Sequence, residues 1–253
     1  MVLDIESFST RSDPVQRSLR GAMYQALETA LKRSGVPTAD ISFEDRGDGV
    51  LMIVSGAVPP AGLVGPFVRE LDEELAEYAR VFSEEHALRC RLALHQGLVT
   101  EDPQGWSGDA VNTACRLVDA GPLREVLTAA ASARMVFVVS DEIYRGLVRH
   151  AHRGIDPAAY LPMPFADKHG RTIESWVTVP GLPAPPGLPV RPAAGPDRRA
   201  AAGLPPEHRP PVPRAADAGA PAPTVSVVAG VVHGDQFTGN KTVTYGTTSP
   251  ERR

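Results

Sequence analysis

Cysteine is scarce in this chain, and long apolar or basic runs are missing. Of 253 residues only Cys90 and Cys115 are cysteines, and both lie in apolar patterns, which favours a reducing compartment over a disulfide framework. No apolar run reaches the length of a membrane span and no leader-like segment is present, so we expect a soluble, cytoplasmic protein. A net charge of −4 without a basic run argues against nucleic acid or a membrane surface as a partner.

Proline is plentiful but unevenly placed. Thirteen of the 25 prolines fall between Pro183 and Pro223, among Ala, Arg and Gly residues that cannot bury much surface. We therefore expect a folded domain over residues 1–181 and a disordered linker over residues 182–223.

The tail at residues 224–253 contains two β-branched runs separated by turn residues, which is typical of a short β-hairpin. An isolated hairpin is marginally stable in water, so this one is expected to pair with a protein partner by β-augmentation. The alternative is a tail without function.

Apolar periodicity in the first 180 residues predicts a mixed α/β (α+β) domain. Strands are expected at residues 2–5, 41–44, 50–54, 88–99, 135–139 and 173–179, the fourth of them half-exposed. Helices are expected at residues 14–34, 60–79, 107–116, 123–131 and 140–150. Helices mixed with hairpin strands favour a mixed sheet that has helices on one or both faces.

The helix expected at residues 107–116 separates two kinds of residue on two faces. One face is an apolar stripe of Val111, Ala114, Cys115 and Val118. On another face Asn112 and Arg116 lie one turn apart, where they can present an amide and a guanidinium to one ligand. Asp109 is a suitable N-cap for this helix. The alternative is a solvated face on which Arg116 pairs with Asp119.

Two aspartates lie at a predicted strand end and in a predicted turn between strands. Asp4 lies near the end of the first strand, and Asp48 lies at the tip of the hairpin that joins the second and third strands. Two carboxylates on neighbouring strands are a normal way to bind Mg²⁺. Taken singly, Asp4 is equally a strand-end cap and Asp48 a residue that suits a tight turn.

Five segments in order resemble motifs of the class III nucleotidyl cyclase catalytic domain. Residues 4–9, Asp-Ile-Glu-Ser-Phe-Ser, resemble its Asp-Ile-x-x-Phe-Ser/Thr opening, and residues 47–49, Gly-Asp-Gly, resemble its Gly-Asp hairpin. Residues 91–97 resemble its Arg-x-x-x-His-x-Gly strand, and residues 108–117 resemble its Gly-x-x-Val-Asn-x-Ala-x-Arg helix. Residues 167–170 resemble the Val-Lys-Gly segment before the last strand. The motifs span nearly all of the predicted domain and none of the tail.

The resemblance implies a ferredoxin-like core with a mainly antiparallel sheet and flanking helices. It also implies a homodimer that converts a nucleoside triphosphate into a 3′,5′-cyclic nucleotide and pyrophosphate, with active sites shared between the subunits. Asp4, Ile5 and Asp48 of one subunit would bind two Mg²⁺ or Mn²⁺ ions, and the backbone from Ile5 to Phe8 would line the triphosphate.

The remaining catalytic groups would come from the partner subunit. By resemblance, Asn112 would orient the ribose, and Arg116 would offset charge around the α-phosphate, where a bidentate guanidinium suits better than Lys. Lys168 would bind the outgoing phosphates. The alternative function is a cyclase-like regulatory domain that binds a nucleotide or a partner without turnover.

The base-recognition positions depart from the family. The family contacts the base with Lys and Asp for adenine or Glu and Cys for guanine, at positions occupied here by Glu44 and Gly105. Glu44 can accept hydrogen bonds from guanine, whereas Gly105 offers no side chain. Trp106 can stack on a base or pack at a dimer interface, and Arg46 can contact the base or a phosphate. This departure fits a pyrimidine-specific cyclase of the kind that bacteria use in phage defence, and it fits loose specificity equally.

Overall fold

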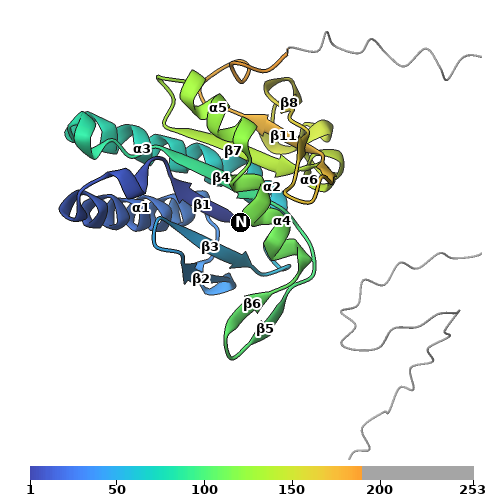
Figure 1. Cartoon of the computed structure of the whole chain (residues 1–253). Helices are drawn as coiled ribbons and strands as arrows, with labels where there is room; N and C mark the ends of the chain where they lie inside the picture. Colours follow the sequence, from blue (N-terminus) through green and yellow to red (C-terminus); the bar gives the residue numbers. More distant parts are fainter. Residues whose placement is uncertain (190–253) are drawn as a thin grey trace, which may run out of the picture. The chain divides into compact units, whose positions relative to one another are not determined.

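A seven-stranded sheet forms the centre of the computed structural model, which describes residues 1–189 (Figure 1). Its strand order is β2-β3-β1-β4-β7-β11-β8. The strands are β1 (Val2–Ile5), β2 (Ile41–Asp45), β3 (Gly49–Val54), β4 (Cys90–Leu94), β7 (Met135–Ser140), β8 (Leu161–Pro162) and β11 (Ser175–Thr178). Two small hairpins pair β5 (Thr100–Asp102) with β6 (Gly105–Ser107) and β9 (Phe165–Ala166) with β10 (Thr172–Ile173).

Helices connect the strands. They are α1 (Asp13–Ser34), α2 (Pro60–Gly62), α3 (Val68–Val81), α4 (Asp109–Val118), α5 (Gly121–Ala129) and α6 (Asp141–Gly146). A π-helical segment, η3 (Leu63–Phe67), joins α2 to α3, and a 3₁₀ turn, η1 (Phe8–Thr10), follows β1. Further 3₁₀ turns are η2 (Thr38–Asp40), η4 (Glu84–His86), η5 (Val148–His150), η6 (His152–Gly154) and η7 (Pro157–Ala159).

The first half of the sheet has the ferredoxin-like arrangement. The order β1, α1, β2, β3, α3, β4 along the chain gives the antiparallel sheet order β2-β3-β1-β4. β4 and β7 then pair in parallel, with α4 and α5 in the connection between them. The predicted mixed, mainly antiparallel sheet with flanking helices is therefore confirmed.

The sheet is covered on both faces, and each face has its own core. α1 and α3 pack on one face, where Leu19 and Phe67 are fully buried. α4 and α5 pack on the other face, where Leu117 and Leu123 are fully buried (Figure 1). Burial of these apolar side chains is the main favourable contribution to folding. The face covered by α4 is the one that contains the site residues described below.

The strand predicted at residues 88–99 is shorter and more buried than expected. β4 ends at Leu94, and all five of its residues are buried, because β1 and β7 pair with its two edges and helices cover both faces. Even Arg91 is only 9% exposed. The prediction of a half-exposed strand is therefore wrong: the alternation of apolar and polar residues reflects an internally paired arginine.

Two predicted helices also end differently. The helix predicted at residues 60–79 is interrupted by η3, which contains Pro66. Proline has no N–H group to donate, so the regular hydrogen-bond ladder cannot continue through it and a π-turn absorbs the mismatch. The helix predicted to reach residue 150 ends at Gly146, and a 3₁₀ turn follows.

The described chain extends past the predicted domain end at residue 181. Leu182 and Leu188 pack against the core under α4 and α5. The rest of the predicted linker at residues 182–223 and the whole predicted hairpin at residues 224–253 lie outside the described residues. Among residues 1–189, no helix combines the length and apolar character that crossing a membrane requires.

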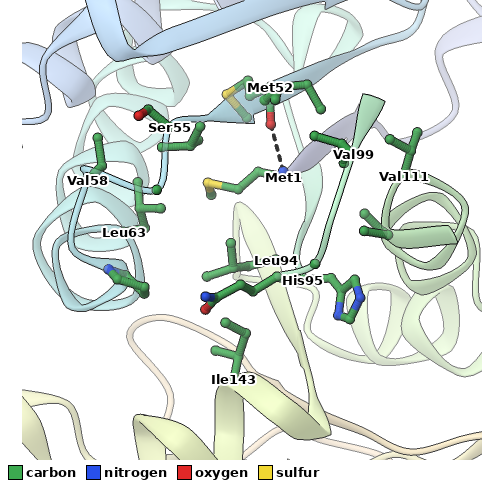
Figure 2. Close-up of a pocket in the computed structure, with 18 of the residues that line it drawn as sticks. Met1, Met52, Ser55, Val58, Leu63, Leu94, His95, Val99, Val111 and Ile143 are labelled. Carbon is green, nitrogen blue, oxygen red and sulfur yellow. Dashed lines mark hydrogen bonds between the residues drawn. The ribbon is translucent and has the colours of Figure 1, made fainter. Parts of the chain in front are cut away.

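An apolar cavity of about 230 Å³ lies where β1 begins (Figure 2). β3 and β4 continue past Met1, whose amine donates a hydrogen bond to the Met52 carbonyl over 2.8 Å. The lining includes Leu63 and Val111, which come from opposite sides of the sheet. No residue predicted for metal or substrate binding lines this cavity, so it is separate from the candidate site.

His95, next to this cavity, should make folding sensitive to acid. Its Nδ1 lies 2.9 Å from the Ser140 hydroxyl, and burial holds the pKa of His95 below its usual value. Below about pH 6.5 the unfolded chain then binds a proton that the folded chain resists, so stability falls as pH decreases. Urea unfolding at pH 7.5 and 5.5 should show a smaller acid-induced loss for His95→Asn than for wild type. Equal losses would contradict this assignment.

Candidate active site

β1 lies between two strands that place a partner on each side of Asp4. Asp4 is paired in register with Gly49 of β3 and with Arg91 of β4. The next residue, Ile5, donates its N–H to the Asp48 carbonyl over 2.9 Å. The three residues predicted to bind metal, Asp4, Ile5 and Asp48, are thus neighbours at one end of the sheet.

The close approach of the β2–β3 hairpin to β1 requires glycine at position 49. A Cβ atom there would lie 2.2 Å from the Leu3 carbonyl oxygen, which no side chain can tolerate. The hairpin turn itself is closed by a hydrogen bond from the Arg46 N–H to the Gly49 carbonyl, 2.9 Å. The Arg20 side chain donates to the Gly47 carbonyl over 3.1 Å. Asp48 is exposed at the tip, and its position is fixed by these contacts.

Arg91 forms an ion pair with Asp4, and both side chains are almost fully buried. Burial raises the pKa of Asp4 to about 6; the Arg91 charge opposes this shift and the Asp48 charge adds to it. The sequence resemblance included Arg91 in a motif but assigned it no role. In the structure, the burial of Arg91 opposite the Asp4 carboxylate indicates this pairing role. The alternation of apolar and polar residues in the sequence does not indicate it.

The aspartate pair has the chemistry of a divalent-cation site. Among residues 1–189, no cluster of three or more His, Cys, Asp or Glu side chains is placed to bind a metal ion. Two carboxylates would be the side-chain donors to a bound ion, and hard cations such as Mg²⁺ or Mn²⁺ take further oxygens from backbone, water and substrate. A cation would also favour the ionised form of Asp4, which burial and Asp48 disfavour. The residues present fit such an ion.

Backbone geometry after β1 suits an anion. Ser7 adopts the left-handed conformation with φ 54°, and η1 begins at the next residue, Phe8. Phe8 packs partly against the core under α1 and α3, which anchors the turn. Consecutive N–H groups around a left-handed residue form a concave anion-binding turn. This is the segment expected to line a triphosphate.

A second group of predicted residues lines a cavity of about 450 Å³. Asn112 and Arg116 reach it from α4, and Lys168 reaches it from the turn between β9 and β10. The cavity is also lined by Cys115, Asp119, Ala120, Gly121, Phe165, Ala166 and Asp167. Its volume lies within the usual range for small-molecule sites.

α4 presents two faces, with two differences from the prediction. Val111, Ala114 and Val118 are buried, whereas Cys115 is half-buried and Leu117 completes the apolar face. The helix begins at Asp109, so Gly108 rather than Asp109 occupies the N-cap position.

The ion pair expected between Arg116 and Asp119 in the solvated-face alternative is not formed among residues 1–189. Asp119 pairs with Arg124 over 3.0 Å rather than with Arg116. Arg116 has only Asp109 nearby, at 3.8 Å, and within the described part of the chain its Nη1 atom is buried without a hydrogen-bond partner. A guanidinium in this state is available to an anionic ligand.

Three hydrogen bonds of Asp167 close the turn that bears Lys168. The Asp167 carboxylate accepts hydrogen bonds from the backbone N–H groups of His169, 2.8 Å, and Arg171, 3.0 Å. The Asp167 N–H also donates to the Arg171 carbonyl over 2.9 Å. Lys168 therefore projects from a fixed turn beside α4.

The two groups occupy different places in one chain. Neither Asp4 nor Asp48 lines the cavity that contains Asn112, Arg116 and Lys168. One group supplies carboxylates and the other supplies an amide and two cationic side chains.

The predicted base-contacting positions are neighbours. Glu44 on β2 approaches Gly105 on β6 so closely that a Cβ atom on Gly105 would lie 3.2 Å from Glu44 Oε2. Arg46 forms an ion pair with Glu44 at 3.0 Å. Trp106 packs partly against the core under α4 and α5. Glu44, Arg46 and Gly105 thus form one cluster beside α4.

Comparisons with known proteins give structural similarities at low sequence identity. No family model and no curated protein matches the chain. It is similar to the catalytic core of a rhodopsin-guanylyl cyclase with converted specificity in complex with ATPalphaS (21% identity, TM-score 0.44). It is also similar to the guanylate cyclase domain of RhGC from Catenaria anguillulae in complex with GTP (19%, 0.43). Each match covers 70% of this chain and 92% of the other.

A third similar structure is an adenylate/guanylate cyclase/hydrolase from Silicibacter pomeroyi, at 18% identity and a TM-score of 0.47. That match covers 72% of this chain and 96% of the other. The function proposed for this chain therefore depends on its own site residues.

Removal of Arg91 should be far more costly than removal of an exposed arginine. Arg91→Met leaves the Asp4 carboxylate buried without its partner, and we expect a loss of about 3 kcal/mol in the free energy of unfolding. Arg80→Met breaks an exposed pair with Glu77 and should cost less than about 1 kcal/mol. The double variant Asp4→Asn/Arg91→Met should recover part of the loss. Denaturant titration is done on wild type, the control variant, Arg91→Met, Asp4→Asn and the double variant. If the losses of Asp4→Asn and Arg91→Met add up to that of the double variant, the pairing is contradicted.

Proposed function

We propose that this chain is a nucleotidyl cyclase that forms a 3′,5′-cyclic nucleotide and pyrophosphate from a nucleoside triphosphate in a homodimer. The observation that supports this most directly is the arrangement of the predicted residues. The carboxylates lie together at one end of the sheet, and Asn112, Arg116 and Lys168 share a separate cavity. A homodimer can bring the carboxylates of one subunit to the cavity of the other, twice by symmetry.

Each side chain has a role that its position supports. In the reaction the ribose 3′-oxygen loses its proton and attacks the α-phosphorus, and the bond from phosphorus to pyrophosphate breaks. Arg116, whose buried Nη1 has no hydrogen-bond partner among residues 1–189, offsets the negative charge that grows on the α-phosphate. Asn112, one turn away, orients the ribose. Lys168 neutralises the pyrophosphate as it leaves.

Asp4, Asp48 and the Ile5 backbone would hold two Mg²⁺ or Mn²⁺ ions, which when bound lower the pKa of the attacking hydroxyl and neutralise phosphate charge. Arg91 keeps the Asp4 carboxylate in place. In the turn from Ile5 to Phe8, the N–H groups of Ser7 and Phe8 would receive the triphosphate, because those of Ile5 and Glu6 already donate to backbone carbonyls.

Product formation tests the proposal directly. The full chain is incubated with each of the four ribonucleoside triphosphates and Mn²⁺, and products are separated by chromatography. We expect a cyclic nucleotide and pyrophosphate in equal amounts from at least one substrate. Binding of a triphosphate without any product would overturn the proposed enzyme and favour a regulatory domain that binds nucleotide.

Mixing two inactive variants tests the shared site. Asp48→Ala and Arg116→Ala alter opposite halves, so each alone should lose at least about 100-fold in turnover without a large change in stability. In a mixture that exchanges subunits, half of the dimers are mixed and each contains one complete site. Activity should then return to about one quarter of wild type. No recovery in a mixture with proven subunit exchange would place all groups in one subunit.

A further inference from the structure

Asp45, the last residue of β2, projects toward α1. It is paired in register with Val50, whose side chain belongs to the core under α1 and α3. Residues paired directly across two strands project to the same face of the sheet. Arg20 and Tyr24 lie one turn apart on α1, and both side chains donate hydrogen bonds to Asp45. One helix therefore holds the end of the strand that leads into the β2–β3 hairpin.

Three donors bind the Asp45 carboxylate. Its Oδ2 atom accepts from the Tyr24 hydroxyl over 2.7 Å and from the Arg20 guanidinium over 2.5 Å, and its Oδ1 atom accepts from the Gly47 N–H over 2.8 Å. The Tyr24 hydroxyl, followed by the Gly47 N–H, holds the pKa of Asp45 below its usual value. The carboxylate is therefore ionised at neutral pH, and all three hydrogen bonds are charge-assisted. Arg20, Tyr24, Asp45 and Gly47 form the Asp45 network.

The Asp45 network reaches the residue before Asp48. Arg20 Nη1 donates to the Gly47 carbonyl over 3.1 Å, so Gly47 is bound through both its N–H and its carbonyl. On the other side, the Asp48 carbonyl accepts from the Ile5 N–H over 2.9 Å. The backbone is thus fixed on both sides of the Asp48 carboxylate, which is itself exposed.

We propose that Arg20 and Tyr24 are positioning residues for the candidate metal site, and that through the Asp45 network they hold Asp48 where it can bind a divalent cation together with Asp4. The inference rests on the proposed cyclase function. Neither positioning side chain contacts the ion or the substrate. A site that is correctly arranged only part of the time has its apparent affinity reduced by that fraction, so the network increases cation affinity by preorganisation.

Charge and position predict opposite results for Arg20→Met. The substitution removes a positive charge near the carboxylates and leaves Asp45 without its ion pair, so charge alone would strengthen cation binding. Loss of position weakens it. We expect the Kd for Mn²⁺ to increase at least about threefold. The Arg20–Asp45 pair is partly exposed, so overall stability should change little.

The Kd is measured on the full chain without nucleotide, from the electron paramagnetic resonance signal of free Mn²⁺. An unchanged or lower Kd in Arg20→Met would overturn the inference.

Tyr24→Phe tests the Asp45 network without a change in charge. It removes one hydrogen bond to Asp45 and keeps a ring that packs partly against the core under α1 and α3. We expect the Kd for Mn²⁺ to increase about twofold, less than in Arg20→Met.

Tyr78→Phe is the matched control. The Tyr78 ring packs partly against the same core, but its hydroxyl has no hydrogen-bond partner among residues 1–189. This variant should bind Mn²⁺ as wild type does. An equal increase in Kd for Tyr78→Phe and Tyr24→Phe would contradict a role of the bond to Asp45.

Amide hydrogen exchange in the metal-free protein reports the hairpin itself. We expect faster exchange over residues 45–49 in Arg20→Met and Tyr24→Phe, and the wild-type rate in Tyr78→Phe. Faster exchange with an unchanged affinity for Mn²⁺ would show a purely structural role and refute the positioning of Asp48.

Product formation by wild type is measured in parallel. If wild type gives a cyclic nucleotide and the variants bind Mn²⁺ as tightly as wild type, the inference is wrong while the proposed function stands. Wild type that gives product without binding Mn²⁺ has the same meaning. If no triphosphate gives product, the proposed function fails and the inference with it.

Discussion

The pairing of β1 with both β3 and β4 is the interaction on which the candidate site depends. It places Asp4 opposite Gly49 on one side and Arg91 on the other, and it brings Asp48 within one backbone hydrogen bond of Ile5. A shift of one residue in this register would turn Asp4 toward the core under α1 and α3. The ferredoxin-like strand order therefore also brings the Asp4 and Asp48 segments next to each other.

The second half of the site depends on the parallel pair of β4 and β7. A parallel pair needs a connection that crosses one face of the sheet, and here that connection contains α4 and α5. The same face receives Glu44 from β2 and the Lys168 turn from the segment after α6. The antiparallel pairs of β1 position the two aspartates, whereas the connection required by the parallel pair contains α4, which bears Asn112 and Arg116. The two groups of residues therefore come from different parts of the fold.

Much of this could be predicted from the sequence, because local signals and tertiary structure agree there. β1, α1 and the β2–β3 hairpin follow from short apolar runs, helical periodicity and an Asp-Gly turn. The burial of Arg91 could not be predicted, since alternation cannot distinguish a solvent-facing arginine from one paired across strands. The approach of Glu44 to Gly105 could not be predicted either, because it depends on where the β5–β6 hairpin lies after folding. The interruption at η3 was signalled by Pro66, but the apolar periodicity around it predicted a continuous helix.

The distance along the chain between Asp4 and Arg91, 87 positions, has a consequence for synthesis on the ribosome. The strand that contains Asp4 leaves the ribosome first, and its partner β3 follows well before β4. Nascent chains fold as their partners emerge, so the two aspartates can meet while the arginine is still being translated. During that interval the first strand has one open edge and an unneutralised carboxylate. A charged side chain on an open strand is expected to disfavour pairing with strands of neighbouring chains.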